Sequence, residues 1–323
     1  MKTTVRRIFS GILFLVILSF LLFVSSLILQ PKDNFRKSVA KDPMAVGILG
    51  EPDETIDAVI LGDSETYCSF IPLKIWQDYG ISTYVCGTTK QKLCYSVEIL
   101  RNSLNSQKPK IVFLETNAVF RKFGRAEEIF QQAEKVFPVF RHHDRWKTFN
   151  MNYFSRETDY TYVDPNKGYL SHSAVKAANE EEYMVRSKKK EKIPAKNIRY
   201  VKDIKAICDQ NNAKLVFISA PSTKNWNYMR HNSMKDFAEE LGVDYIDLNT
   251  LHSEINIDWS KDSMDNGDHL NLSGALKVTR YLGKYLDDQK IFEDKRELPV
   301  YSEWNEAVDE FNKSTKNSLK DKK

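Results

Sequence analysis

The chain has 323 residues, of which 41% are hydrophobic and 28% charged, and this composition excludes a disordered protein. A total of 48 Lys and Arg against 44 Asp and Glu gives a net charge of +4. Nucleic-acid-binding proteins usually carry a larger, clustered excess, so we expect no nucleic-acid partner. Twelve Gly and ten Pro without a period exclude a collagen-like architecture.

The N-terminus carries an uncharged, almost wholly apolar run over residues 8–29. As a helix it is long enough to cross about 30 Å of hydrocarbon. Lys2, Arg6 and Arg7 precede it, which favours a cytoplasmic N-terminus, although basic residues within 32–37 weaken this charge asymmetry. A cleavable signal has a shorter apolar core and a small-x-small exit site. We therefore favour an uncleaved signal anchor over a cleaved signal or a buried core helix.

Strand and helix patterns alternate after this segment. Continuous short apolar runs are typical of strands that are buried on both faces, and five such runs occur at Ile56–Leu61, Ile81–Cys86, Lys110–Leu114, Lys214–Ser219 and Val243–Leu248. Apolar residues at helical spacing lie between and after them, for example over 91–105 and 199–211. The pattern predicts a three-layer α/β sandwich with a mainly parallel, five-stranded sheet, preceded by one transmembrane helix.

The remaining segments divide the chain. We expect a transmembrane anchor over 1–30, a stalk over 31–54 that contains three prolines, an α/β domain over 55–290 and a polar tail over 291–323. A segment at about 121–198 is too long for a plain crossover. Its aromatic and basic residues fit a cap over the active site or a docking surface, and they fit equally an ordinary helical elaboration.

The strongest chemical signal is Gly62-Asp63-Ser64, directly after the first predicted strand. In open α/β sheets, ligands bind outside the carboxyl ends of the strands, where Ser64 would lie beside a helix start that favours a developing anion. The alternative interpretation, without catalysis, is that Ser64 only caps that helix.

A second signal precedes the last predicted helix, where His269 follows Asp265 and Asp268. A serine hydroxyl needs a base to become nucleophilic, and a carboxylate on the other ring nitrogen would orient that base. Among the six histidines, His269 is the one with flanking carboxylates and a helix start behind it. Alone, it would be an ordinary loop residue.

Together these signals resemble the SGNH (GDSL-type) hydrolase superfamily, which has a flavodoxin-like α/β fold. The first block of that family is matched by Ile60–Ser64, the second by Val85–Thr88, the third by Glu115–Asn117, and the last by the stretch that ends in His269. The resemblance spans about 56–287, apart from the inserted segment.

The resemblance implies a role for each matched residue. Ser64 would be the nucleophile and His269 the general base. The backbone N–H groups of Ser64 and Gly87, with the Asn117 side chain, would form the oxyanion hole. The acid of the family usually stands three residues before the histidine, where this chain has Asn266. Either Asp265 or Asp268 would have to serve instead, and we favour Asp265; without either, a Ser–His dyad or an inactive site would remain.

One span followed by an outward SGNH-like domain is similar to bacterial proteins that O-acylate envelope polysaccharides and to DltD-like proteins of teichoic-acid D-alanylation. This similarity implies an esterase or O-acyltransferase that acts on an ester-bearing or hydroxyl-bearing envelope glycan, with a membrane O-acyltransferase as a possible partner. The alternative is a catalytically degenerate domain that scaffolds such an acyltransferase, and Asn266 is the residue that favours it.

Other chemistry finds little support. His142-His143-Asp144 has no evident third ligand at metal spacing, and no phosphate-binding glycine motif occurs, so we expect neither a metal nor a cofactor. The four Cys include no CxxC pair. Cys86 and Cys94 could form a disulfide, although free buried thiols fit the sequence better.

Overall fold

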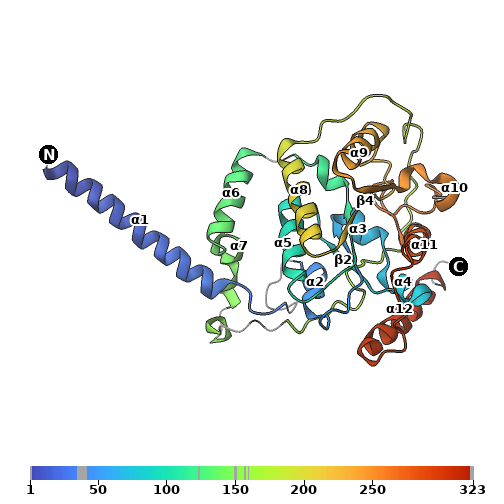
Figure 1. Ribbon diagram of the computed structural model, residues 1–323, viewed down its shortest axis with the longest axis horizontal. Helices are drawn as coiled ribbons and strands as arrows, with labels where there is room; N and C mark the ends of the chain where they lie inside the picture. Colours follow the sequence, from blue (N-terminus) through green and yellow to red (C-terminus); the bar gives the residue numbers. More distant parts are fainter. Residues whose placement is uncertain are drawn as a thin grey trace. The chain divides into compact units, whose positions relative to one another are not determined.

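A computed structural model describes residues 2–34, 42–122, 124–148, 151–155, 158 and 160–320. The chain forms two compact units (Figure 1). Unit 1 combines Met1–Lys41 with Lys122–Tyr162, and unit 2 combines Asp42–Arg121 with Val163–Lys323. The segment predicted as an insertion is therefore divided, because its first part belongs with the N-terminal helix and the rest with the sheet. Of the predicted stalk, 35–41 lie outside the described residues.

Unit 2 contains a five-stranded, all-parallel sheet, as predicted. Its strands are β1 (Ala58–Gly62), β2 (Thr83–Gly87), β3 (Ile111–Glu115), β4 (Lys214–Ser219) and β5 (Asp244–Asp247). Their order is β2-β1-β3-β4-β5. This is the doubly wound order, in which β2 lies on one side of β1 and the later strands are added on the other side. Each predicted run overlaps its strand, with ends that differ by up to two residues.

The sheet separates two apolar cores. Along β1, Val59 and Leu61 pack into one core, while Ala58 and Ile60 pack into the other. Successive strand residues point to opposite faces, so a continuous apolar run fills both sides of the sheet. This burial on both faces confirms the three-layer architecture.

Helices cover both faces of the sheet in unit 2 (Figure 1). The first core receives residues of α5 (Leu93–Ser103), α8 (Ala195–Gln210) and α9 (Tyr228–Leu241). The second core receives residues of α10 (His252–Ile255) and α11 (Leu272–Asp288). Two further helices, α3 (Ser64–Ser69) and α4 (Pro72–Tyr79), follow β1 and contact α11.

The flanks of the α/β domain are more structured than the sequence suggests. Within the predicted stalk, α2 (Pro43–Val46) and the 3₁₀ turn η1 (Gly47–Gly50) bury Ala45 and Ile48 completely. Within the predicted polar tail, the 3₁₀ turn η6 (Pro299–Tyr301) leads into α12 (Ser302–Lys320).

Aromatic packing holds the tail on unit 2. The rings of Tyr301 and Trp304 lie 4.8 and 5.3 Å from the Trp76 ring. Trp304 also donates a hydrogen bond from its indole nitrogen to Glu51. A few large aromatic side chains bury much area. They are enough to pack the tail against the core even though its composition is mostly polar.

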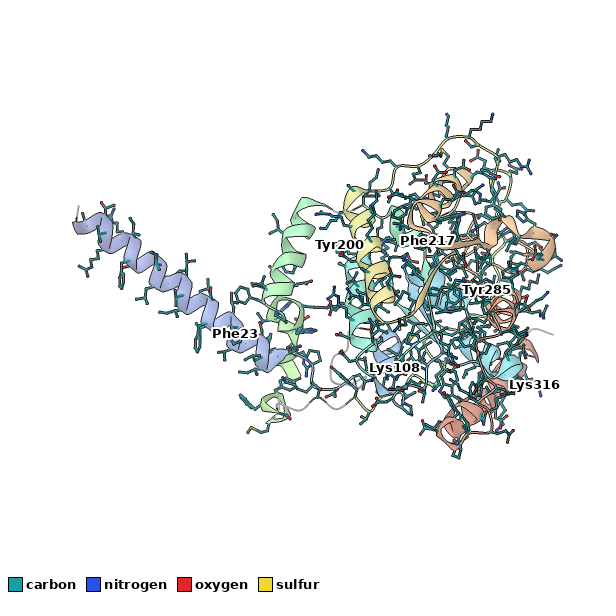
Figure 2. The ribbon with its side chains drawn as sticks, viewed as in Figure 1. Phe23, Lys108, Tyr200, Phe217, Tyr285 and Lys316 are labelled. Carbon is teal, nitrogen blue, oxygen red and sulfur yellow. The ribbon has the colours of Figure 1, made fainter. Side chains whose placement is uncertain are left out.

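Unit 1 contains the long helix α1 (Lys2–Leu29), then α6 (Arg125–Val136), α7 (Val139–His142) and the 3₁₀ turns η3 (His143–Thr148) and η4 (Met151–Phe154). Within Thr3–Leu29, the most apolar stretch of 18 residues has a mean hydropathy of 3.0, and only 6% of that stretch is buried. Side chains project from α1 along its length, Phe23 among them (Figure 2). By length and composition α1 matches a membrane span, a test that a signal sequence also passes.

Candidate active site

The turn after β1 places Ser64 at the carboxyl edge of the sheet. Gly62 ends the strand, and a Cβ there would lie 1.8 Å from the Thr66 hydroxyl, so only glycine fits. Asp63 caps α3 because its side chain accepts a hydrogen bond from the Glu65 amide at 3.1 Å. Ser64 is thus the first residue of α3. Asp63 is the N-cap residue, a role that the alternative interpretation of the sequence gave to Ser64.

A tight loop before α11 presents His269. An antiparallel bridge between Ser263 and Leu270 closes the loop. Asn266 and Gly267 both adopt left-handed backbone conformations, with φ of 63° and 88°. A Cβ on Gly267 would lie 1.9 Å from the Thr223 hydroxyl, so both its conformation and its surroundings require glycine.

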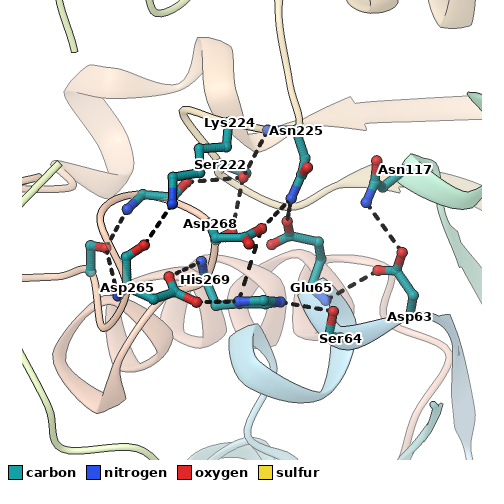
Figure 3. A network of polar contacts seen from close by, with 12 residues as sticks. Asp63, Ser64, Glu65, Asn117, Ser222, Lys224, Asn225, Asp265, Asp268 and His269 are labelled. Carbon is teal, nitrogen blue, oxygen red and sulfur yellow. Dashed lines mark hydrogen bonds and ion pairs between the residues drawn. The ribbon is translucent and has the colours of Figure 1, made fainter. Parts of the chain in front are cut away.

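The Ser64, His269 and Asp265 side chains form a continuous chain of polar contacts (Figure 3). Ser64 Oγ lies 2.7 Å from His269 Nε2, and His269 Nδ1 lies 2.6 Å from Asp265 Oδ2. The second oxygen of Asp265 accepts a hydrogen bond from the His269 backbone amide at 2.7 Å. Both carboxylate oxygens of Asp265 therefore hold the same histidine.

Asp268 takes a different position. Its Oδ1 lies 4.0 Å from His269 Nδ1, beyond hydrogen-bond distance, and it accepts a hydrogen bond from Asn225 instead. The left-handed turn at Asn266 and Gly267 reverses the chain between Asp265 and His269. This reversal lets an acid four residues before the histidine reach the ring, although the family pattern has the acid at three.

Gly87 and Asn117 lie at the same edge as Ser64. Gly87 ends β2 and pairs in register with Gly62, and Asn117 lies two residues after the end of β3. These residues come from the ends of the three adjacent strands β2, β1 and β3, so Ser64 and Asn117 stand on the two sides of the point where the strand order reverses. Ligands of open α/β sheets bind at such points.

The Asn117 side chain is fixed at both ends. Its Nδ2 donates to Asp63 Oδ2 at 3.2 Å, and its Oδ1 accepts from the Arg230 guanidinium at 3.1 Å. Arg230 also pairs with Glu191 at 3.0 Å. Because a guanidinium only donates, Arg230 determines which end of the Asn117 amide carries the donor that faces Asp63.

Buried carboxyl groups surround Ser64. Burial, reinforced by the charge of Asp63, raises the pKa of Glu65 and the pKa of Glu115 well above the usual value. Burial also raises the pKa of Asp63, while the contacting Arg121 guanidinium opposes that rise. Asp63 and Arg121 thus form an ion pair in this cluster, and burial disfavours the charged form of both glutamic acids.

Arg121, Asn225 and Arg230 are among the residues of this network that were not predicted. Asn225 donates from its amide nitrogen to Glu65 Oε1 and to Asp268 Oδ1, both at 2.5 Å. It lies in the loop after β4, and the rule that sites gather at the carboxyl ends of parallel strands could have pointed to that loop. Arg230 lies inside α9, and no local pattern distinguishes it.

The second part of the inserted segment runs beside this site. The backbone amide of Leu170 donates to the Tyr67 carbonyl at 2.9 Å, and the backbone amide of Leu272 donates to the His172 carbonyl at 2.8 Å. Burial and the nearby His269 imidazole lower the pKa of His172, which keeps its ring neutral. Residues 170–178 therefore flank the helix of Ser64 and the loop of His269.

The side chains around Ser64 and His269 form a poor metal-binding site. Ligand atoms of Glu65, Asp268 and His269 lie within 4.8 Å of one another. However, both ring nitrogens of His269 are engaged by Ser64 and Asp265, and the raised pKa of Glu65 disfavours the deprotonated carboxylate that a metal ion binds. The arrangement fits proton transfer better than metal binding. The four cysteines, all within the described residues, form no disulfide.

Similar solved structures come from SGNH and GDSL-type enzymes, all with low sequence identity. One is a lipase/acylhydrolase from Enterococcus faecalis, with 9% identity and a TM-score of 0.39 over 72% of this chain and 97% of that chain. Another is a GDSL-like lipase from Bacteroides thetaiotaomicron, with 9% identity and a TM-score of 0.36 over 72% and 88%. A third is a psychrotrophic esterase from Pseudoalteromonas sp., with 9% identity and a TM-score of 0.37 over 72% and 98%.

No family model and no curated protein matches the sequence. Likenesses with TM-scores below 0.5 do not assign an activity.

Proposed function

We propose that this protein is a serine-dependent acyl-ester hydrolase or O-acyltransferase that acts on a cell-envelope glycan or related polymer outside the cytoplasmic membrane. The observation that carries the proposal is the contact chain Ser64–His269–Asp265, with distances of 2.7 and 2.6 Å. A base must lie within about 3 Å of the proton that it removes, and His269 meets this condition for Ser64.

The reaction would proceed in two steps. Ser64 Oγ attacks the ester carbonyl carbon while His269 Nε2 accepts the hydroxyl proton, and the carbonyl oxygen becomes an oxyanion. The intermediate collapses, the C–O bond to the leaving alkoxide breaks, and His269 returns the proton to that oxygen. An acyl group then remains on Ser64. Water or a sugar hydroxyl, deprotonated by His269, attacks this ester, and His269 returns the proton to Ser64 Oγ as the bond between the acyl carbon and Oγ breaks.

Asp265 would hold His269 in the tautomer that carries its proton on Nδ1 and would stabilise the imidazolium that forms. The oxyanion would be held by the backbone N–H groups of Ser64 and Gly87 and by Asn117 Nδ2. Removal of one such donor typically lowers turnover by roughly 10²–10³-fold. Arg230 supports this role because it fixes the orientation of the Asn117 amide.

The alternative, a degenerate domain that scaffolds a membrane acyltransferase, drew its support from Asn266. The contact of Asp265 with His269 supplies the carboxylate that Asn266 lacks. This contact supports the enzyme over the scaffold.

The envelope location is supported by α1, which has the length and hydropathy of a membrane span, and by the basic residues before it. With the N-terminus inside, unit 2 would lie outside the membrane. A tethered enzyme and a surface polymer share a small volume, which raises their effective concentration. A membrane O-acyltransferase that delivers acyl groups across the membrane would be a natural partner.

A fluorophosphonate probe and an activated acetyl ester test this proposal. We expect the full chain in detergent to be labelled at Ser64 and to turn over the ester, and Ser64→Ala to lose both reactions. Ser103→Ala is a suitable comparison because the Ser103 hydroxyl donates to the Ile99 carbonyl within α5, a helix that carries none of the proposed site residues. Persistent labelling of Ser64→Ala would reject the nucleophile, and a wild-type chain inert to both reagents would favour the scaffold.

A further inference from the structure

Unit 1 exposes large apolar side chains outside α1. They lie on α6, η3 and η4 and are Ile129, Phe130, Val136, Trp146, Met151 and Phe154, each more than half exposed; we call them the unit 1 patch. In the described part of unit 2, the exposed large apolar residues are aliphatic only. A surface of this kind, with several aromatic residues in one small unit, indicates an interaction site.

α7, which contacts α6, packs against the C-terminal end of α1. Ser26 is buried, and its hydroxyl accepts a hydrogen bond from the Val139 amide at 3.1 Å. Both η3 and η4 also contact α1. Just after the helix, Asn34 exchanges two hydrogen bonds with the backbone of Tyr162, at 2.6 and 2.9 Å. The end of α1 is thus folded into unit 1, as expected for an anchor that is retained.

This packing places Trp146 on η3, and Met151 and Phe154 on η4, on elements that contact α1. The uncharged stretch 8–29 is about 33 Å long as a helix, close to the thickness of the hydrocarbon layer. Ser26 therefore lies at the boundary between hydrocarbon and headgroups on the side where α1 ends. Trp and other amphipathic aromatic residues concentrate at that boundary, and the exposed Lys147 beside Trp146 can reach the headgroups.

We propose that the unit 1 patch inserts into the interface of the same bilayer that α1 crosses, so that lipid covers it. The proposal depends on α1 spanning the membrane, but it is independent of any catalytic role for Ser64. It makes unit 1 a module with two attachments to the membrane, the span itself and an interfacial apolar surface.

Trp146 provides a native probe for this proposal. It is 64% exposed, whereas Trp76, Trp226, Trp259 and Trp304 are at most 3% exposed, and α1 contains no tryptophan. The full chain, with α1 verified by intact mass, is placed in nanodiscs that contain phosphatidylcholine brominated near the headgroup end of its acyl chains. We expect bromolipid to quench an emission component that Trp146→Phe removes, and we expect aqueous iodide to leave that component unquenched.

A matched pair of variants sharpens the test. Met151→Ser with Phe154→Ser should reduce the quenching of Trp146 by bromolipid, whereas Leu298→Ser with Val300→Ser, in unit 2, should leave it unchanged. Quenching of Trp146 by iodide but not by bromolipid would place the patch in water and overturn the proposal. Protection from both quenchers would indicate a second copy or another protein as the occupant, which also overturns it. An intact mass showing that α1 is removed from the mature protein would also overturn the proposal.

Discussion

Among the described residues, two histidine–carboxylate pairs have the same short contact. His269 Nδ1 lies 2.6 Å from Asp265, and His231 Nδ1 lies 2.6 Å from Asp247. Their surroundings differ. The second nitrogen of His269 faces the Ser64 hydroxyl at the sheet edge, whereas the His231 ring packs near Tyr228 and Tyr245, with centroids 5.1 and 5.9 Å away.

This difference teaches that an imidazole held by a carboxylate is not by itself a catalytic signature. Asp247 also accepts a hydrogen bond from the Trp226 indole at 3.0 Å, so the second pair ties α9 to the end of β5. What distinguishes the first pair is the hydroxyl on its far side and the strand ends that surround it.

Alanine substitution of each histidine should give the largest difference between the two pairs. His269→Ala removes the base and should lower ester turnover by roughly 10⁴-fold or more. His231→Ala should leave turnover within a few-fold of wild type but should lower the free energy of unfolding by about 1–3 kcal/mol, because Asp247 loses a partner. Turnover and urea unfolding are measured on both variants. Equal losses of activity would remove the distinction between the pairs.

The two aspartates near His269 give the next largest contrast. Asp265→Asn should lower turnover by roughly 10⁴-fold, because an amide can stabilise the wrong imidazole tautomer and cannot stabilise the imidazolium. Asp268→Asn should lose less than about tenfold, since Asp268 contacts Asn225 and not the ring. Steady-state rates with an activated ester decide between them. Near-wild-type rates in both variants would contradict the proposed triad.

The smallest effect concerns stability and pH. The native pKa of Glu65 is well above its usual value, so between about pH 4.5 and that raised pKa the native state holds a proton that the unfolded state has released. Stability from this group is complete below the unfolded pKa and is lost as pH rises through that window. Glu65→Gln cannot titrate, so its melting temperature relative to wild type should rise from pH 5 to pH 8. A constant difference across that range would mean that Glu65 is ionised in the native state.

Much of unit 2 could be predicted from local patterns. The five strands are short apolar runs whose residues fill both cores, and the position of Ser64 follows from a Gly-Asp-Ser turn after the first run. His269 could be selected because few histidines exist and because it precedes a helix. The packing of the tail was only partly predictable, because its buried aromatic residues, Tyr301, Trp304 and Phe311, lie in a mostly polar segment.

The sequence by itself determined the parallel α/β sheet, the long apolar helix and the two residues, Ser64 and His269, that could exchange a proton. Hydrophobic periodicity and turn chemistry are local properties, and they are legible along the chain. Only the tertiary structure decided that Asp265 holds the histidine, that Arg230 orients Asn117, and that residues 122–162 join the end of α1. These outcomes depend on two left-handed backbone residues and on contacts between segments far apart in the chain, which no local pattern specifies.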